Sequence, residues 1–339
     1  MADEAAKSSI DGFFMRCGLT TQDQDDCYGF IKRLYSKEEI VAASCQGFCS
    51  MTLLVGTRIV VQFRPESYRL DLRITAAAPE IYGKLAPQTS FIGIVPSSGL
   101  LAYTMSRIEG VPFKDFRRSS VFLQRPTYYQ AILCKDLAKF LSAAWHNRRG
   151  HFIELGLVGK SIRPRLEALC SDLPYRFRAR AHHILKNIHR IEGLPWVLTH
   201  GDIVSGNIMV DVFTGKLTGL VDWAEAEPRL PFGICLYGLE EILGEMTVNG
   251  FQYYPDGAQL RNHFWAELAD NIPDLRQSYM LESVKLARDL GVLLWHGIAF
   301  DDGAINRVVQ EGRDIEEIHR LDAFLDLSEY QSLDLACKI

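Results

Sequence analysis

Apolar positions change their spacing along the chain, and this change separates a strand-rich segment from a helical one. From residue 38 onward, short apolar and β-branched runs are bounded by turn residues, the pattern of consecutive strands. The second and third runs are joined by a short turn at Gly56-Thr57, as in a hairpin. We therefore predict five strands, at residues 40–44, 51–55, 59–64, 91–95 and 100–105. Between the third and fourth strands, residues 67–86 suit a helix that Pro79 would cut or kink.

Beyond residues 110–112 the apolar spacing becomes helical. Apolar side chains recur every three or four residues and predict an amphipathic helix at 127–146, with similar patterns at 174–191, 258–270 and 276–298. Residues 1–37 are polar and are expected to be irregular, with residues 22–26 as a helix start or a solvated turn. The expected division is thus an N-terminal extension at 1–37, an N-lobe at 38–106 and a C-lobe at 107–339.

Composition and charge narrow the class of protein. At 339 residues, with 47% hydrophobic and 23% charged residues, the chain is typical of a globular protein with two domains or lobes. The net charge of −5 argues against nucleic acid as the main partner, because a nucleic-acid-binding protein usually carries a basic surface. We find no apolar run of the ~18 residues a membrane helix needs and no secretory signal, so we expect a cytoplasmic protein. The eight Cys include no Cys-x-x-Cys pair, which argues against a zinc site or a disulfide framework.

The strongest chemical signal is the segment from Thr199 to Val210. Within it Asp202 is followed five positions later by Asn207, the order that a phosphoryl-transfer loop requires. In such a loop the carboxylate meets the attacking hydroxyl and the amide oxygen faces a metal ion on the nucleotide phosphates. A further apolar strand at 217–221 ends in Asp222, where a kinase places its main Mg²⁺ carboxylate. An Asp and an Asn at this spacing occur by chance in many chains, so the prediction depends on both motifs in this order.

These residues resemble the motifs of the aminoglycoside phosphotransferase and choline kinase family, small-molecule kinases with the protein-kinase fold. The family's catalytic loop has His-Gly-Asp, a few variable residues, then Gly-Asn and an apolar triplet, as at 200–202 and 206–210 here. Its metal motif is Asp-Trp or Asp-Phe with a nearby Glu, as at 222–225. The resemblance covers residues 38–325 and implies an α+β, bilobal protein-kinase-like fold. That fold has a small antiparallel β-sheet in the N-lobe and a larger, mostly helical C-lobe.

The resemblance implies a role for each of these side chains. Asp202 would act as base or orient the acceptor hydroxyl, because phosphoryl transfer is largely positioning and charge stabilisation. Asn207 and Asp222 would hold Mg²⁺, a hard ion that prefers oxygen ligands. His200 is expected to be a hydrogen-bonded scaffold residue that packs the loop, rather than a catalytic one.

The residues that bind ATP are expected in the N-lobe. Gly47 and Ser50 lie between the first two predicted strands, where the family has its phosphate-covering turn, although an ordinary hairpin turn explains them equally well. On the third strand kinases usually have a Lys and many relatives an Arg. Here Gln62 aligns best with that cation, but only Arg64 is charged, and strand alternation puts both on one face. We predict that Arg64 contacts phosphate with Gln62 beside it.

Two further parts of the nucleotide site are implied by the same resemblance. Backbone groups near Met105 and Arg107, at the expected lobe boundary, would bind the edge of the adenine ring. Glu80 is the nearest carboxylate for the role of the helical Glu that pairs with the strand cation, and a plain surface role is an equal alternative.

The acceptor pocket is the least defined part of the site. Glu225 and Glu227 lie just past the metal motif and could bind a second metal or a cationic acceptor, or be solvated loop residues. Relatives often carry an Asp shortly after the metal motif, and residues 228–233 lack one. This departure argues against an antibiotic-modifying enzyme, and the chain looks more like the divergent fungal branch of the family, whose substrates are mostly unassigned.

Three functions are compatible with these patterns. The first is an ATP- and Mg²⁺-dependent phosphotransferase acting on a hydroxyl of a small-molecule metabolite. The altered third strand and the single Gly of the phosphate turn leave open a nucleotide-binding pseudokinase with a regulatory role. The third is a ligase-type enzyme of the same fold, which would use ATP to activate a carboxylate or to join two molecules.

Overall fold

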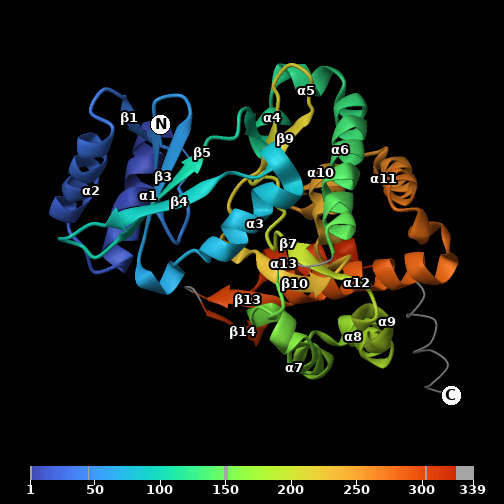
Figure 1. The fold of residues 1–339 in the computed structure, drawn as a ribbon. Helices are drawn as coiled ribbons and strands as arrows, with labels where there is room; N and C mark the ends of the chain where they lie inside the picture. Colours follow the sequence, from blue (N-terminus) through green and yellow to red (C-terminus); the bar gives the residue numbers. More distant parts are fainter. Residues whose placement is uncertain (1, 45, 149–151, 302–303, 326–339) are drawn as a thin grey trace. The chain divides into compact units, whose positions relative to one another are not determined.

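The chain folds into two compact units, residues 1–109 and 110–339 (Figure 1). The computed structural model describes residues 2–44, 46–148, 152–301 and 304–325. The first unit contains a five-stranded antiparallel sheet, and the second contains most of the helices. The α+β class predicted from the apolar spacing is therefore confirmed. No helix in the described ranges combines the length and the hydropathy that crossing a membrane requires.

The sheet of the first unit has the strand order β1-β2-β3-β5-β4. Its strands are β1 (Ile40–Ala42), β2 (Met51–Val55), β3 (Ile59–Arg64), β4 (Thr89–Ile94) and β5 (Leu101–Ser106), close to the five predicted runs. Between β3 and β4 lie the 3₁₀ turn η1 (Glu66–Tyr68), the helix α3 (Leu72–Tyr82) and the 3₁₀ turn η2 (Gly83–Leu85). Pro79 lies inside α3 without ending it, and the helix stops at Gly83, whose φ of 60° leaves the helical region.

Residues 1–37 are not irregular, contrary to the expectation from their polarity. They form α1 (Ala2–Arg16) and α2 (Thr21–Leu34). The start of α2 is fixed by Asp23, whose carboxylate accepts the backbone N–H of Thr20 over 2.8 Å. Phe13 on α1 and Ile31 on α2 are buried in the same core as the sheet. The polar residues are the exposed faces of amphipathic helices, so the average polarity of this segment concealed its periodic apolar face.

The two faces of the sheet carry different side chains, because residues alternate along a strand. Leu53 on β2 and Phe63 on β3 are buried in the core shared with α1 and α2. Thr52 pairs with Gln62 across the two strands, so Thr52, Gln62 and Arg64 lie on the other face. The predicted phosphate-binding residues of β3 thus share the sheet face opposite to the one that packs on α1 and α2.

The second unit is mostly helical. Its longer helices are α6 (Pro126–His146), α7 (Leu157–Asp172), α8 (Tyr175–Lys186), α11 (Gly257–Asn271), α12 (Ser278–His296) and α13 (Ile315–Phe324). Shorter ones are α4 (Phe113–Phe116), α5 (Ser120–Gln124), α9 (Ile188–Glu192), α10 (Glu240–Leu243), η3 (Trp223–Glu225), η4 (Ile234–Leu239) and η5 (Pro273–Arg276). α11 packs along α6, and α12 packs against η4 and α13 (Figure 1). The helices predicted at 127–146, 258–270 and 276–298 are confirmed, while 174–191 is divided into α8 and α9 at Asn187.

Short strands hold the loops of the second unit. β8 (Ile208–Val210) pairs with β6 (Val111–Pro112) and with β9 (Leu217–Leu220), and β7 (Trp196–Thr199) pairs with β10 (Glu227–Pro231). Two further hairpins are β11 (Gly244–Thr247) with β12 (Gly250–Tyr253), and β13 (Ile298–Asp301) with β14 (Ala304–Val308). The segment between β7 and β8 and the segment after β9 contain the two predicted motifs.

Candidate functional site

The antiparallel pairing of β8 with β9 brings the two sequence motifs together. Ile208 at the start of β8 is paired with Leu220 at the end of β9, so the residues just outside this pair are also adjacent. The backbone N–H of Val221 donates to the carbonyl oxygen of Asn207 over 3.0 Å. Asn207 and Asp222 are fifteen residues apart in the sequence. In the structure the backbone of Asn207 is hydrogen-bonded to Val221, the residue directly before Asp222.

Asp202 and Asn207 are in direct contact. The side-chain Nδ2 of Asn207 donates to Oδ2 of Asp202 over 2.7 Å and to the backbone carbonyl of Asp202 over 3.0 Å. These bonds close the loop between β7 and β8 and fix the direction of the Asp202 carboxylate. They use the nitrogen of the Asn207 amide, so its oxygen, the atom that a metal would take, is not consumed by this contact.

His200 joins the catalytic loop to the segment that precedes Asp222. Its Nε2 lies 3.0 Å from the carbonyl oxygen of Val221, and its Nδ1 accepts the backbone N–H of Asp202 over 3.2 Å. Both contacts require a neutral ring with the proton on Nε2. Burial lowers the pKa of His200 to about 4, which keeps the ring neutral. The expected hydrogen bonding of His200 is confirmed, and its role as a scaffold residue stays a prediction.

Asp222 has an unusual backbone conformation. Its φ of 61° and ψ of 72° lie in the left-handed region, and among the described residues no other non-glycine residue has a positive φ. This conformation is unfavourable for an L-residue, and such residues cluster at functional sites where the surroundings hold them in place. Asp222 is exposed. The strain is an observation independent of the sequence motif, and it singles out the same residue.

Gly201 is required by the close approach of two segments. Its φ is 82°, and a Cβ at this position would lie 2.0 Å from the carbonyl oxygen of Glu225. No side chain fits such a distance from backbone. The glycine of the His-Gly-Asp sequence thus lets the catalytic loop pass directly against the segment that follows Asp222.

The Asp202 carboxyl is proton-accepting near neutral pH. Burial raises its pKa to about 7, the carboxylates of Asp222 and Glu225 act in the same direction, and the Asn207 contact opposes them. A base with a pKa near the working pH is suited to receive a proton from an attacking hydroxyl.

Three residues that are far from the loop in the sequence, and that the sequence did not indicate, hold it by hydrogen bonds. The hydroxyl of Tyr237, buried on η4, donates to the carbonyl of Gly201 over 3.0 Å. The backbone N–H of Ser205 donates to the Glu241 carboxylate over 3.2 Å, and the backbone N–H of Lys114 donates to the Ser205 carbonyl over 2.9 Å. These contacts span 36 to 91 residues of sequence, so no local pattern could have indicated them.

Glu225 and Glu227 have different surroundings. Glu225 lies on η3 and is exposed, as an acceptor-binding residue would be. Glu227 is 6% exposed, and both of its oxygens accept backbone N–H groups at the start of α7, from Val158 at 2.9 Å and Gly159 at 3.2 Å. It is neither a solvated loop residue nor available to an acceptor, because its carboxylate satisfies a helix N-terminus.

In the first unit the structure brings Gln62 and Arg64 together. Arg64 is buried, and its Nε donates to Oε1 of Gln62 over 3.0 Å, while Nε2 of Gln62 lies 3.4 Å from the Thr52 hydroxyl. The prediction that the two share a strand face is confirmed. Met105 lies on the same face, because it pairs with Val60, two residues before Gln62. Their contact with a nucleotide stays a prediction.

The segment before β2 is held by side chains. The side-chain Nε2 of Gln46 donates to the carbonyl oxygens of Ala43 and Thr52 over 2.8 and 2.9 Å. Its Oε1 accepts the backbone N–H of Thr52 over 2.8 Å. From α1, Arg16 donates to the Phe48 carbonyl over 3.0 Å and stacks on the Phe48 ring. The predicted turn at 47–50 is therefore held in place by the side chains of Gln46 and Arg16. The sequence did not indicate the contact of Arg16.

The remaining predicted residues of this unit differ in their burial. Gly47 is exposed and Ser50 is buried. Arg107 is exposed, and its backbone N–H donates to the carbonyl of Arg58 over 2.8 Å just beyond β5. Glu80 is exposed on α3. None of these placements conflicts with the predicted roles, and the roles stay predictions.

The Mg²⁺ implied by the motifs fits the donor set. In the described ranges no group of three or more His, Cys, Asp or Glu side chains is arranged to hold a metal. Mg²⁺ does not require one, because it commonly takes one or two protein oxygens and completes its shell with water and phosphate. The exposed Asp222 carboxylate and the Asn207 amide oxygen are such a pair, held adjacent through Val221.

Comparison with known proteins supports the same family. Residues 97–261, which include both motifs, match the model of the family described as "APH: Phosphotransferase enzyme family". The uncharacterized protein YcbJ of Bacillus subtilis (strain 168) is 35% identical over 92 residues, which are 26% of this chain and 28% of the length of that protein.

Among solved structures, the GDP and kanamycin complex of APH(2")-IIia matches with a TM-score of 0.52 at 15% identity, over 79% of this chain and 90% of that one. The GDP complex of wild-type aminoglycoside 2'-phosphotransferase-IIIa matches with a TM-score of 0.47 at 14% identity, over 78% and 97% of the two chains. The first of these likenesses confirms the predicted protein-kinase-like fold.

Proposed function

We propose that this chain, whose residues 97–261 match a family of phosphotransferase enzymes, transfers the γ-phosphoryl group of ATP to a hydroxyl of a small-molecule metabolite. The observation that carries the proposal is the contact of Asp202 with Asn207 in a loop tied through Val221 to Asp222. A base, an amide oxygen and an exposed carboxylate are the groups that phosphoryl transfer needs around one triphosphate.

Each residue would have a distinct task. Asp202 would align the acceptor oxygen and receive its proton as the bond to phosphorus forms. Asn207 and Asp222 would hold Mg²⁺, which neutralises charge on the phosphate oxygens when bound. In the first unit, Arg64 would contact phosphate with Gln62 beside it, the loop at Gly47 and Ser50 would cover the phosphates, and backbone near Met105 and Arg107 would take the adenine edge.

The acceptor would bind to the second unit near Asp202. Glu225 is exposed and lies against the catalytic loop through its backbone, so we propose it as a residue that contacts the acceptor. The solved neighbour APH(2")-IIia is a complex with kanamycin. Residues 228–233 contain no acidic side chain, and we propose a metabolite rather than a polycationic antibiotic as the acceptor.

The test is incubation of the purified protein with ATP, Mg²⁺ and a small-molecule cell extract, followed by mass spectrometry of the metabolites. We expect one metabolite to gain a phosphoryl group with wild type and not with Asp202→Asn, together with release of ADP. Mg²⁺-dependent ATP binding without turnover would favour the pseudokinase. Release of AMP or formation of a condensation product would favour the ligase-type enzyme.

A further inference from the structure

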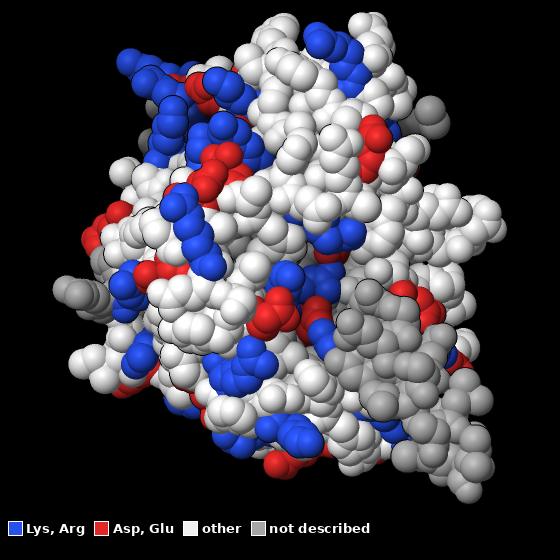
Figure 2. Space-filling model, turned by 90° about the vertical axis from the view of Figure 1, so that its right-hand side faces the viewer, with Lys and Arg blue, Asp and Glu red and all other residues white. Residues whose placement is uncertain are grey.

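A cavity of about 1020 Å³ in the second unit is lined by more cations than carboxylates. Its cations are Arg176, Arg180, Arg190, Arg261, Lys285 and Arg288. Four carboxylates line the same space, those of Glu240, Glu282, Asp289 and Asp322, and Arg176 also pairs with Glu311 outside the lining, which leaves an excess of one positive charge. Blue side chains with a few red ones gather around a hollow on the face shown in Figure 2. Small-molecule sites usually enclose about 300–1,000 Å³, so the cavity is large enough for a metabolite.

The cavity is separate from the catalytic loop. The segment formed by η4 and α10 lies between the cavity and the catalytic loop, since some of its residues contact the loop and others line the cavity. Tyr237 and Glu241 bond the catalytic loop at Gly201 and Ser205. Leu236, Leu239 and Glu240, from the same segment, line the cavity instead. A molecule in the cavity would therefore lie on the far side of η4 and α10 from Asp202.

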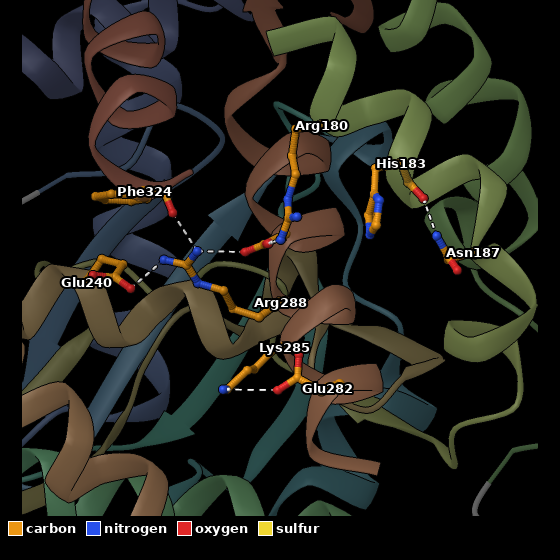
Figure 3. A network of polar contacts seen from close by, with 9 residues as sticks. Arg180, His183, Asn187, Glu240, Glu282, Lys285, Arg288 and Phe324 are labelled. Atoms are coloured by element: carbon orange, nitrogen blue, oxygen red, sulfur yellow. Dashed lines mark hydrogen bonds and ion pairs between the residues drawn. The ribbon is translucent and has the colours of Figure 1, made fainter. Parts of the chain in front are cut away.

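The deep wall of the cavity is a chain of buried charges. Glu240 is 1% exposed and accepts from Arg261 over 2.6 Å and from Arg288. Asp289 accepts from Arg288 over 2.7 Å and from Arg180. Arg288 also donates to the Phe324 carbonyl, as Figure 3 shows. Arg180, Arg261 and Arg288 are thus joined to the carboxylates of Glu240 and Asp289 in one network.

A fourth arginine of the lining has no carboxylate partner within the part of the chain that the structure describes. Among the described residues, Arg190 on α9 contacts two neutral oxygens, the Ser283 hydroxyl and the Tyr279 carbonyl, each at 3.4 Å. Lys285 contacts Glu282 over 3.2 Å, and both of these side chains are about half exposed. An exposed pair of this kind is weak, so Lys285 is able to exchange its partner for a ligand.

Aromatic side chains also line the cavity. Tyr253, Trp265 and Phe324 line the cavity beside the charged groups. Open volume, an arginine held only by neutral oxygens, a weakly paired lysine and aromatic side chains together are typical of a binding site.

We propose that this cavity binds a small organic metabolite with at least two negatively charged groups, phosphates or carboxylates. Arginine forks bind both groups in a bidentate manner, and the aromatic side chains would contact the body of the molecule. This second site is distinct from the ATP and acceptor sites of the proposed function and does not depend on them.

The test is calorimetric titration of the full chain with inorganic pyrophosphate in Mg²⁺-free buffer of low salt. The cavity variant is Arg190→Gln with Lys285→Gln, chosen because neither side chain is buried. The matched control is Arg276→Gln, an exposed arginine outside the cavity that pairs with Asp270. We expect binding by wild type and by the control, and binding ~10-fold or more weaker by the cavity variant.

Three outcomes would overturn the proposal. The first is the absence of binding by wild type at millimolar pyrophosphate. The second is an equal loss in Arg276→Gln, which would show a general effect of charge. The third is loss of binding in Arg64→Ala with retention in the cavity variant, which would place the anion in the first unit. Since neither nucleotide nor turnover enters the measurement, failure of the phosphotransferase proposal would leave this result unaffected.

Discussion

His200 Nε2 donates to the carbonyl oxygen of Val221 over 3.0 Å, and through this bond one imidazole ring holds the catalytic loop against the residue before Asp222. The other ring nitrogen accepts the backbone N–H of Asp202 over 3.2 Å. The proposed general base and the proposed metal carboxylate are thus positioned by a single neutral side chain, which gives His200 a structural reason to precede Gly201 and Asp202.

Replacing His200 by Ala should destabilise the protein and loosen the site. Two hydrogen-bond partners would be left unsatisfied in a buried place, which costs about 1–3 kcal/mol each for uncompensated groups. We expect a lower melting temperature in thermal denaturation and a smaller shift on adding MgATP. The control is His182→Ala, since His182 is exposed on α8. Wild-type stability and a wild-type MgATP shift in His200→Ala would contradict the scaffold role.

Asp202→Asn and Asp222→Ala should separate catalysis from metal binding. Asp202→Asn keeps the shape of the side chain, so we expect near-normal MgATP binding with turnover lower by roughly 10²–10⁴-fold, the usual contribution of a general base. Asp222→Ala should lose the Mg²⁺-dependent part of the ATP-induced rise in melting temperature, because a ligand stabilises only the state that binds it. Thermal shifts with ATP, with and without Mg²⁺, measure this before any acceptor is known. A full Mg²⁺-dependent shift in Asp222→Ala would show that the metal is held elsewhere.

Arg64→Ala should weaken binding of an ATP analogue with Mg²⁺ more than Gln62→Ala does. Charge-assisted hydrogen bonds are roughly twice as strong as neutral ones. In Gln62→Ala the Nε of Arg64 also loses its 3.0 Å partner, so we expect a smaller but measurable loss there. Calorimetric titration compares the two, with Arg58→Ala, an exposed arginine before β3, as the control for surface charge. A larger loss in Gln62→Ala than in Arg64→Ala would reverse the assignment.

His296→Gln should make the protein less sensitive to acid. Burial, with the nearby Arg320 and Arg288 cations, lowers the pKa of His296 to about 3, against 6.5 for the unperturbed side chain. Between these values the unfolded chain binds a proton that the native state does not, so stability falls as the pH drops, by up to ~1.4 kcal/mol per pH unit. The variant lacks this contribution. Urea denaturation at pH 7 and pH 5 should show a smaller loss of stability in His296→Gln than in wild type, with the exposed His263→Gln unchanged from wild type. Equal losses in all three proteins would refute the prediction.

Local sequence determined much of the fold and the core of the candidate site. Strands β2 and β3 and helix α6 follow from apolar spacing alone, because period-2 and period-3.6 patterns depend on neighbours a few residues apart. The order of Asp202, Asn207 and Asp222 is likewise a local signal, since the β8–β9 hairpin that unites them is short. The sequence also placed Gln62 and Arg64 on one strand face.

Tertiary structure decided what depends on contacts between distant segments. The polar segment 1–37 is helical because its apolar residues reach a core formed by the sheet, which its own sequence does not contain. Glu227 is buried because the start of α7, about seventy residues earlier, presents N–H groups to it. The surplus of cations in the cavity is gathered from α8, α9, α11 and α12, where each Arg alone looks like an ordinary surface residue. A sequence specifies which side chains exist and their local periodicity, but the desolvation and pairing that give a charge its function are set only when remote elements pack together.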